Sequence, residues 1–181
     1  MIKKAALLMI CFFVGNIIFS QKMMTRTGEI KFEASVPSFE SVAAESNSVS
    51  AVLDESNGEF AVLALIKTFK FKVPLMEEHF NENYIESSIY PKATFKGKII
   101  NFDVSKLTTS GKYDLEGDLT IHGVTKKIKT KISMVLKEGK LYTTSGFAVK
   151  AQDFNIKIPG IVKSKISEDV IVTVNLVLGK K

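Results

Sequence analysis

Apolar and polar residues alternate at every second position along most of the chain after residue 90. In a β-strand this alternation places the apolar side chains on one face, to be buried, and the polar side chains on the other. Gly139 and Pro159 separate the alternating segments, because glycine tolerates the positive φ of a tight turn and proline interrupts a strand. The pattern predicts five strands after residue 90: one near Thr94–Asp103, then Tyr113–Ile121, Lys127–Leu136, Leu141–Ala151 and Val170–Leu178.

The first half of the chain is also mostly β in pattern, with shorter segments. Asn57-Gly58 is a strong signal for a tight hairpin. Ser41–Ser46 fits a strand and a helix equally well. The apolar face changes phase within Thr94–Asp103, which predicts a β-bulge there. The strands predicted before that segment are Gly28–Ala34, Val49–Leu53, Glu59–Ile66 and Thr68–Val73.

One segment is predicted to be helical. Pro74 suits a first helical turn, Glu77 suits the positive end of the helix dipole, and Met76 and Phe80 fall on one face. A short helix is therefore expected near residues 74–82. About eight strands with one short helix, and no interdomain linker, indicate a single all-β domain, either an antiparallel barrel or a sandwich. A closed barrel of eight strands has room for one small ligand.

The start of the chain has the layout of a secretory signal peptide. Lys3 and Lys4 precede an apolar run over residues 5–14, and the small residue Ser20 offers a cleavage site. A membrane-spanning helix needs about 20 apolar residues, so a cleaved signal is favoured over an uncleaved anchor.

Residues 1–20 are therefore predicted to be a signal peptide, and residues 21–181 a mature domain that is periplasmic or secreted. Removal of the signal lowers the formal net charge of the chain from +6 to +4. It also removes Cys11, the single cysteine, so the mature domain has to fold without a disulfide.

Candidate catalytic groups are few. His79 lies on the predicted helix and His122 in a predicted tight connection, and neither belongs to a recognised nucleophile motif. The simpler interpretation of His122 is a turn residue whose ring bonds to nearby backbone; a functional role is left open. One cysteine and two histidines provide no structural zinc ligand set. A metal site built from the two histidines with carboxylates stays open, but the spacing does not require one, and no cofactor is expected.

Basic residues gather on one predicted strand. Lys127, Lys129 and Lys131 share its outward face, directly after Lys126. The simpler interpretation is a solvated surface, and the functional alternative is attraction to anionic lipid or to envelope polymers. No aromatic RNA-binding motif accompanies these lysines, so a nucleic acid partner is not expected.

The chain contains thirteen Phe and no Trp. Inward-facing residues of the predicted elements form either a plain core or the wall of an apolar ligand cavity. Periodicity does not distinguish a filled barrel from a hollow one. The candidates for such a wall are Phe69, Phe71, Met76, Phe80, Phe95, Tyr113, Met134 and Phe147.

Two motifs resemble those of the YceI-like family. One is Gly117–Lys126, GDLTIHGVTK, and the other is Tyr90–Phe95, YPKATF, followed by Gly97. Leu75–Tyr84 is similar to the short helical insertion that precedes the second motif in the family. The order of these features matches from Gly28 to Leu178, although the chain lacks the Trp-containing start that is usual in the family.

The resemblance implies a lipocalin-like antiparallel β-barrel with a long internal channel. It also implies a carrier of polyisoprenoid lipids, such as isoprenoid quinones or prenols, in the bacterial periplasm. We expect the first motif to determine the fold before it contacts ligand, with two side chains facing inward and a glycine that permits the tight reversal. Its central residues are Leu119, Thr120, Ile121, His122, Gly123 and Val124.

The leading hypothesis is an exported, non-enzymatic carrier that holds an apolar lipid inside the barrel. Transient membrane contact and a homodimer are both compatible with it. The alternative is an envelope interaction module with a filled barrel, whose basic strand face binds anionic membrane or polymer. An enzyme that depends on His122 is the third hypothesis.

Overall fold

The computed structural model describes residues 22–37, 39–107 and 110–180. The signal peptide predicted for residues 1–20 lies outside the described residues. Within them, no helix is long and apolar enough to cross a membrane. The strands are β1 (Lys22–Ser35), β2 (Ala43–Asp54), β3 (Glu59–Leu65), β4 (Lys70–Phe71), β5 (Lys92–Ile99), β6 (Gly111–Ile121), β7 (Val124–Lys137), β8 (Lys140–Lys150) and β9 (Ile166–Lys180).

Short helical segments connect several of these strands. The helix α1 (Pro74–His79) continues directly into the π-helical turn η2 (Phe80–Tyr84). Pro74 is the first residue of α1, where its missing N–H costs nothing. The helix predicted near residues 74–82 is thus confirmed. The 3-10 turns are η1 (Ile66–Thr68), η3 (Val104–Lys106), η4 (Ala151–Phe154) and η5 (Lys163–Lys165).

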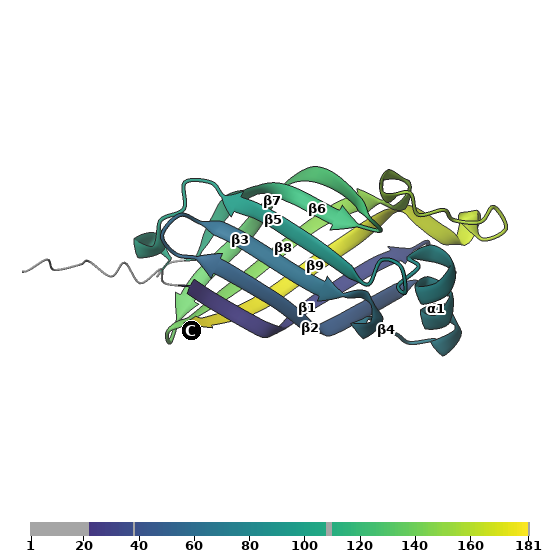
Figure 1. The fold of residues 1–181 in the computed structure, drawn as a ribbon, viewed down its shortest axis with the longest axis horizontal. Helices are drawn as coiled ribbons and strands as arrows, with labels where there is room; N and C mark the ends of the chain where they lie inside the picture. Colours follow the sequence, from purple (N-terminus) through teal and green to yellow (C-terminus); the bar gives the residue numbers. More distant parts are fainter. Residues whose placement is uncertain (1–21, 38, 108–109, 181) are drawn as a thin grey trace, which may run out of the picture.

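Eight of the strands close into an antiparallel barrel (Figure 1). The order around the barrel is β1-β9-β8-β7-β6-β5-β3-β2, and β2 pairs with β1 to complete the circle. β4 is an additional short strand that pairs with β2. The predicted all-β, lipocalin-like barrel of about eight strands is therefore confirmed, and the sandwich is excluded.

Three local predictions need correction or completion. The strand predicted at Thr68–Val73 is reduced to β4, because η1 occupies its start and Pro74 begins a helix directly after it. The bulge expected within Thr94–Asp103 is absent, since β5 pairs in continuous register and ends at Ile99. Register shifts occur instead in β1, on both sides of Gly28. The ambiguous Ser41–Ser46 joins β2 from Ala43 onward.

The interior is filled at the end of the barrel where β1 starts and β9 finishes. Large aliphatic side chains from the strands and from the β5–β6 connection interdigitate there, each no more than 1% exposed. At the opposite end lie α1 and the segment between β8 and β9 (Figure 1). We call this opposite end the mouth of the barrel. The side chains of the filled end are Met23, Leu53, Ile99, Leu107, Met134, Leu141 and Leu178.

Two glycines make room for an aromatic ring inside the barrel wall. Gly97 on β5 and Gly117 on β6 are directly paired across the two strands. A Cβ atom on Gly117 would lie 2.5 Å from the Cα of Gly97 and 2.7 Å from Cζ of Phe95. The Phe95 ring therefore packs over backbone that carries no side chains, and this contact explains the glycine in each of the two motifs.

We expect Gly117→Ala to lower the free energy of unfolding by about 1–3 kcal/mol, because the added methyl displaces the Phe95 ring or the β5 backbone. Urea denaturation of the two proteins measures the difference. Gly146→Ala on β8 is the matched control, since a Cβ there meets nothing closer than 3.8 Å. Equal effects of the two substitutions would contradict this role of Gly117.

Candidate functional site

The half of the barrel nearer the mouth encloses a cavity of about 530 Å³. This volume lies within the range of about 300–1,000 Å³ that is typical of small-molecule sites. Its wall is built from inward-facing residues of β1, β3 and β5–β9, together with the β1–β2 connection, the η1–β4 segment, α1, η2 and the segment between β8 and β9. The lining is almost wholly apolar, so the cavity favours a hydrophobic occupant.

Four phenylalanines form one side of this cavity. Phe32 comes from β1, Phe69 from the residue before β4, Phe71 from β4 and Phe80 from η2. The ring centroid of Phe32 lies 5.3–5.8 Å from the other three. Tilted and edge-to-face pairs at such distances are the favourable aromatic geometries. The cluster thus packs the helical segment onto the barrel and forms an aromatic wall.

The structure places most of the predicted cavity residues on the wall of the cavity. Tyr113 and Met134 do not line it, because both lie toward the filled end. Met134 is 1% exposed within the aliphatic core, and the Tyr113 ring covers Gly111, whose Cβ would lie 3.0 Å from it. The residues that line the cavity as predicted are Phe69, Phe71, Met76, Phe80, Phe95 and Phe147.

The sequence motif is divided between the cavity and the outside of the barrel. Leu119 and Ile121 line the cavity. Val124 packs against the core without reaching the cavity. Thr120 faces away from the cavity, and its hydroxyl forms a hydrogen bond of 2.8 Å with the hydroxyl of Thr125.

His122 and Gly123 form the tight turn between β6 and β7. Their φ angles are 50° and 72°, and Ile121 pairs with Val124 on either side. Two consecutive residues with positive φ define a type I′ turn, whose twist matches that of the strands. A Cβ on Gly123 would lie 2.7 Å from the Tyr90 ring, so the tyrosine of the YPKATF motif packs directly on this turn.

The His122 ring links three segments at the barrel rim. Nδ1 lies 3.0 Å from the carbonyl oxygen of Phe154 in η4, to which it donates. Nε2 lies 2.8 Å from Oε2 of Glu86, in the connection after η2. The ring of Tyr90 packs edge-on against the His122 ring, with 4.3 Å between the two ring centroids. His122 is buried, with both nitrogens occupied, so its observed contacts are structural.

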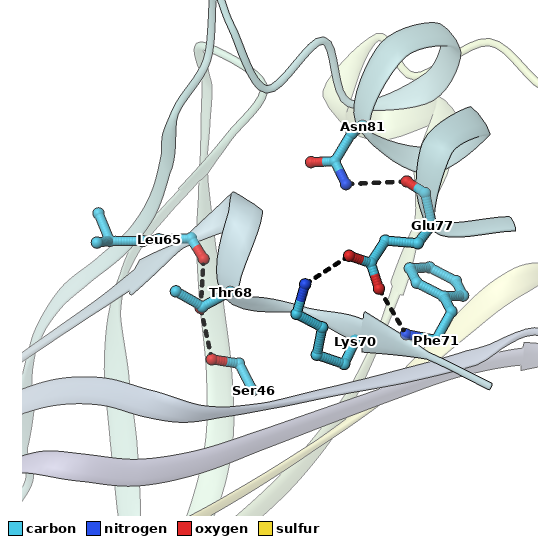
Figure 2. A network of polar contacts seen from close by, with 7 residues as sticks. All are labelled: Ser46, Leu65, Thr68, Lys70, Phe71, Glu77 and Asn81. Carbon is cyan, nitrogen blue, oxygen red and sulfur yellow. Dashed lines mark hydrogen bonds and ion pairs between the residues drawn. The ribbon is translucent and has the colours of Figure 1, made fainter. Parts of the chain in front are cut away.

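Glu77 anchors the helical segment to the barrel (Figure 2). One of its carboxylate oxygens accepts a hydrogen bond of 2.6 Å from Lys70 Nζ, and the other accepts one of 3.3 Å from the Phe71 backbone N–H. The contact with Lys70 is the main reason that the pKa of Glu77 is held below its ordinary value of 4.5. The two bonds join α1 to β4.

A second polar contact fixes the turn that leads into β4 (Figure 2). Thr68 Oγ1 donates to the carbonyl oxygen of Leu65 at 2.6 Å. Because that proton is used, Ser46 Oγ, 2.6 Å away, donates to Thr68. The buried Ser46 of β2 thus ties η1 to the barrel, which sets the position of Phe69 in the aromatic wall.

Several cavity residues were not among the candidates chosen from the sequence. Phe32 and Val172 belong to predicted strands whose period-two alternation already places them on the inner face. Ile128 belongs to the predicted strand Lys127–Leu136, whose alternation places it on the apolar face. Phe154 lies between predicted strands, and only the fold of η4 turns it into the barrel.

The basic strand face is neutralised by its neighbour. Lys129 Nζ lies 2.9 Å from Glu116 and Lys131 Nζ lies 2.5 Å from Asp114, both on β6. These pairs lower the positive potential that the sequence pattern suggested. Across the residues that the structure describes, no group of three or more His, Cys, Asp or Glu side chains is placed to hold a metal ion.

The closed barrel and its apolar cavity define a lipocalin-like binding protein. The model of the YceI-like domain matches residues 18–178, so the chain belongs to that family, as the two motifs predicted. No curated protein matches the chain.

Solved structures share this fold. A polyisoprenoid binding domain from Saccharophagus degradans, implicated in plant cell wall breakdown, aligns with a TM-score of 0.75 at 16% identity, covering 88% of this chain and 98% of that one. Burkholderia cenocepacia BcnA gives 0.69 at 16% identity, with 82% and 95% covered. The Campylobacter jejuni YCEI protein gives 0.64 at 19% identity, with 81% and 88% covered.

We expect Glu77→Gln to lower protein stability in a pH-dependent manner. The folded-state pKa is lower than the unfolded one, so the contribution of the carboxylate is complete at neutral pH and is lost as the pH falls through the lowered pKa. The substitution should cost up to about 1 kcal/mol near pH 7, as for other solvated ion pairs.

Thermal unfolding of wild type and of Glu77→Gln, measured from neutral pH down through the lowered pKa of Glu77, tests the effect. The exposed neighbour Glu78, changed to Gln, is the matched control. A stability difference that does not shrink as the pH is lowered from neutral to well below the ordinary carboxyl pKa of 4.5 would contradict the assignment.

Proposed function

We propose that this protein is an exported, non-enzymatic carrier that holds the chain of a polyisoprenoid lipid inside the barrel. The observation that carries the proposal is the apolar cavity, which is closed by the aliphatic core at one end and bordered by α1 and the β8–β9 segment at the other. The polyisoprenoid named for the Saccharophagus degradans domain supports this class of ligand. An isoprenoid quinone or a prenol belongs to this class of ligand.

Desolvation provides the driving force for such binding. Each Å² of apolar surface removed from water contributes about 25 cal/mol, so burying about 300 Å² of a lipid chain contributes about 7.5 kcal/mol before the entropic cost of association. The flat rings of the aromatic wall suit the regularly spaced, isolated double bonds and methyl branches of an isoprenoid chain. The binding mode requires no catalytic group, in agreement with the structural contacts of His122.

The alternative function, an envelope module with a filled barrel, is disfavoured. The interior is not filled, because it contains a cavity of about 530 Å³. In this alternative, Lys129 and Lys131 would bind the anionic partner. Both are instead paired with acidic residues of β6.

Contact with a membrane fits the surface around the mouth. Segment 156–166 contains three lysines and no acidic residue. One of them, Lys163, is paired with Glu168 just beyond the segment at 3.2 Å, and no ion pair is found for Lys157 or Lys165 among the described residues. Ile161 at its tip is 87% exposed, whereas Val162 and Ile166 line the cavity. Exposed apolar side chains flanked by lysines are suited to an interface with anionic lipid. A barrel resting on this segment would have its mouth at the bilayer surface.

The predicted signal peptide accords with such a site of action. We propose a periplasmic or secreted location for the mature domain. In such a location, a carrier of insoluble lipid would operate between membranes. Mass determination of the N-terminus of the mature protein tests the predicted cleavage after Ser20.

Native mass spectrometry of the purified protein, before and after incubation with an isoprenoid quinone or a prenol, tests lipid binding. We expect a bound lipid in wild type and a loss of at least about tenfold in affinity for Val149→Trp, because the indole occupies the cavity. Ala148→Trp, one residue away on the outer face of β8, should bind like wild type. Failure of the wild type to bind any such lipid would refute the proposal.

Co-sedimentation with vesicles tests the membrane contact. Replacing Lys157, Lys163 and Lys165 by Gln should weaken binding to phosphatidylglycerol-containing vesicles about tenfold or more, since each lysine near an anionic surface is worth about 1 kcal/mol. Ile161→Asp should weaken binding to phosphatidylcholine vesicles as well. The matched control replaces Lys127, Lys129 and Lys131 by Gln; a larger loss in this control would favour the strand face over the mouth.

A further inference from the structure

Three hydroxyl side chains on two adjacent strands form part of the mostly apolar cavity wall. Thr130 lies on β7, and Thr143 and Ser145 lie on β8. Thr143 is paired with Met134, which belongs to the filled end, and Ser145 is paired with Ile132, one step nearer the mouth. The hydroxyls therefore lie at the inner end of the cavity, next to the aliphatic core.

The hydrogen bonds of these hydroxyls are unequal. Thr130 Oγ1 donates to the carbonyl oxygen of Gly146 at 3.0 Å, and Ser145 Oγ donates to that of Lys131 at 2.8 Å. Thr143 is 4% exposed. Its hydroxyl makes no hydrogen bond with any residue that the structure describes, and it remains accessible from the cavity. One donor and several acceptor lone pairs consequently remain available at this end of the cavity.

A buried hydroxyl without a partner is unfavourable, because it loses its hydrogen bonds to water. A pure hydrocarbon chain in the cavity would leave the Thr143 hydroxyl in this state. An occupant with a polar group at its inner end would satisfy it. The apolar wall and this unpartnered hydroxyl together therefore select an amphiphile oriented with its polar end inward.

We propose that Thr143, supported by Thr130 and Ser145, forms a polar subsite that binds a neutral hydroxyl or carbonyl group at the end of the lipid. This inference rests on the proposed function and specifies the ligand within it. A hydroxyl both donates to and accepts from such groups, and a carbonyl accepts from Thr143.

The charge of the cavity excludes a phosphate end group at the same place. The basic residues of the lining, His79 and Lys165, lie in the segments at the mouth and are exposed. No basic side chain lines the inner end among the described residues. A buried phosphate without a cation is strongly disfavoured. His79 and Lys165 are hydrated, so they do not require a partner from the lipid.

Three probes of similar chain length test the subsite: geranylgeraniol, geranylgeranyl phosphate and a hydrocarbon of the same chain. Their affinities are measured for wild type, Thr143→Val, Thr143→Ser and the outward-facing control Thr144→Val. Thr143→Val should weaken geranylgeraniol binding about fivefold to tenfold, and it should leave hydrocarbon binding unchanged or stronger. Thr143→Ser and Thr144→Val should bind geranylgeraniol within about twofold of wild type.

The outcomes separate the two proposals. Suppose that wild type binds these lipids, and that Thr143→Val either weakens the binding of geranylgeraniol and of the hydrocarbon equally or weakens the binding of neither. The polar subsite is then refuted, and the lipid carrier stands. Preferential binding of the phosphate refutes the neutral end group. If no probe binds to wild type, both proposals fail.

Ligand orientation gives a second, independent measurement. A prenol with a photoreactive group beside its hydroxyl should cross-link to the peptide that contains residues 141–145. Cross-linking to Phe39 or to residues 156–165 at the mouth would overturn the inward orientation. Thr143→Val without ligand should unfold at a urea concentration no lower than wild type, which excludes misfolding as the cause of weaker binding.

Discussion

The hydrogen bonds between β1 and β2 close the sheet, and the other properties of the molecule depend on this closure. An open sheet of these strands would expose two edges to water and to other chains. Once the circle is complete, the strand backbones are paired around the barrel, and the interior can be both apolar and dry. A closed circle of eight strands also fixes the width of the interior, which the side chains then fill or leave open.

Side-chain size and the position of the helical segment decide where the interior is open. Met23, Leu53 and Leu178 fill one end to nearly complete burial. Toward the mouth, the phenylalanine cluster lines the wall without filling the centre. Phe80 reaches this cluster because Glu77 holds α1 on β4 and Thr68 fixes the turn before it. Polar contacts outside the cavity therefore determine the shape of its apolar wall.

The two family motifs act together on the fold. Tyr90 packs on the turn formed by His122 and Gly123, and His122 in turn reaches Phe154 and Glu86. Because Phe154 and Ile85, beside Glu86, both line the cavity, this tie positions parts of the wall without direct contact between the histidine and the ligand space. Gly97 and Gly117 play a similar part for Phe95. The motifs are thus explained by packing and turn geometry.

The amino-acid pattern alone was sufficient for the strands of the second half, the short helix, the inward face of residues such as Phe95 and Phe147, and the family. These features depend on local periodicity, turn residues and short motifs. It could not place Tyr113 and Met134 at the filled end, bring Phe154 into the wall, or reveal that Lys129 and Lys131 are paired with β6. Those outcomes depend on strand register and on contacts between segments far apart in the chain, as does the hollow itself. Period-two alternation determines which side chains face inward, whereas only the closed barrel determines which of them meet across it.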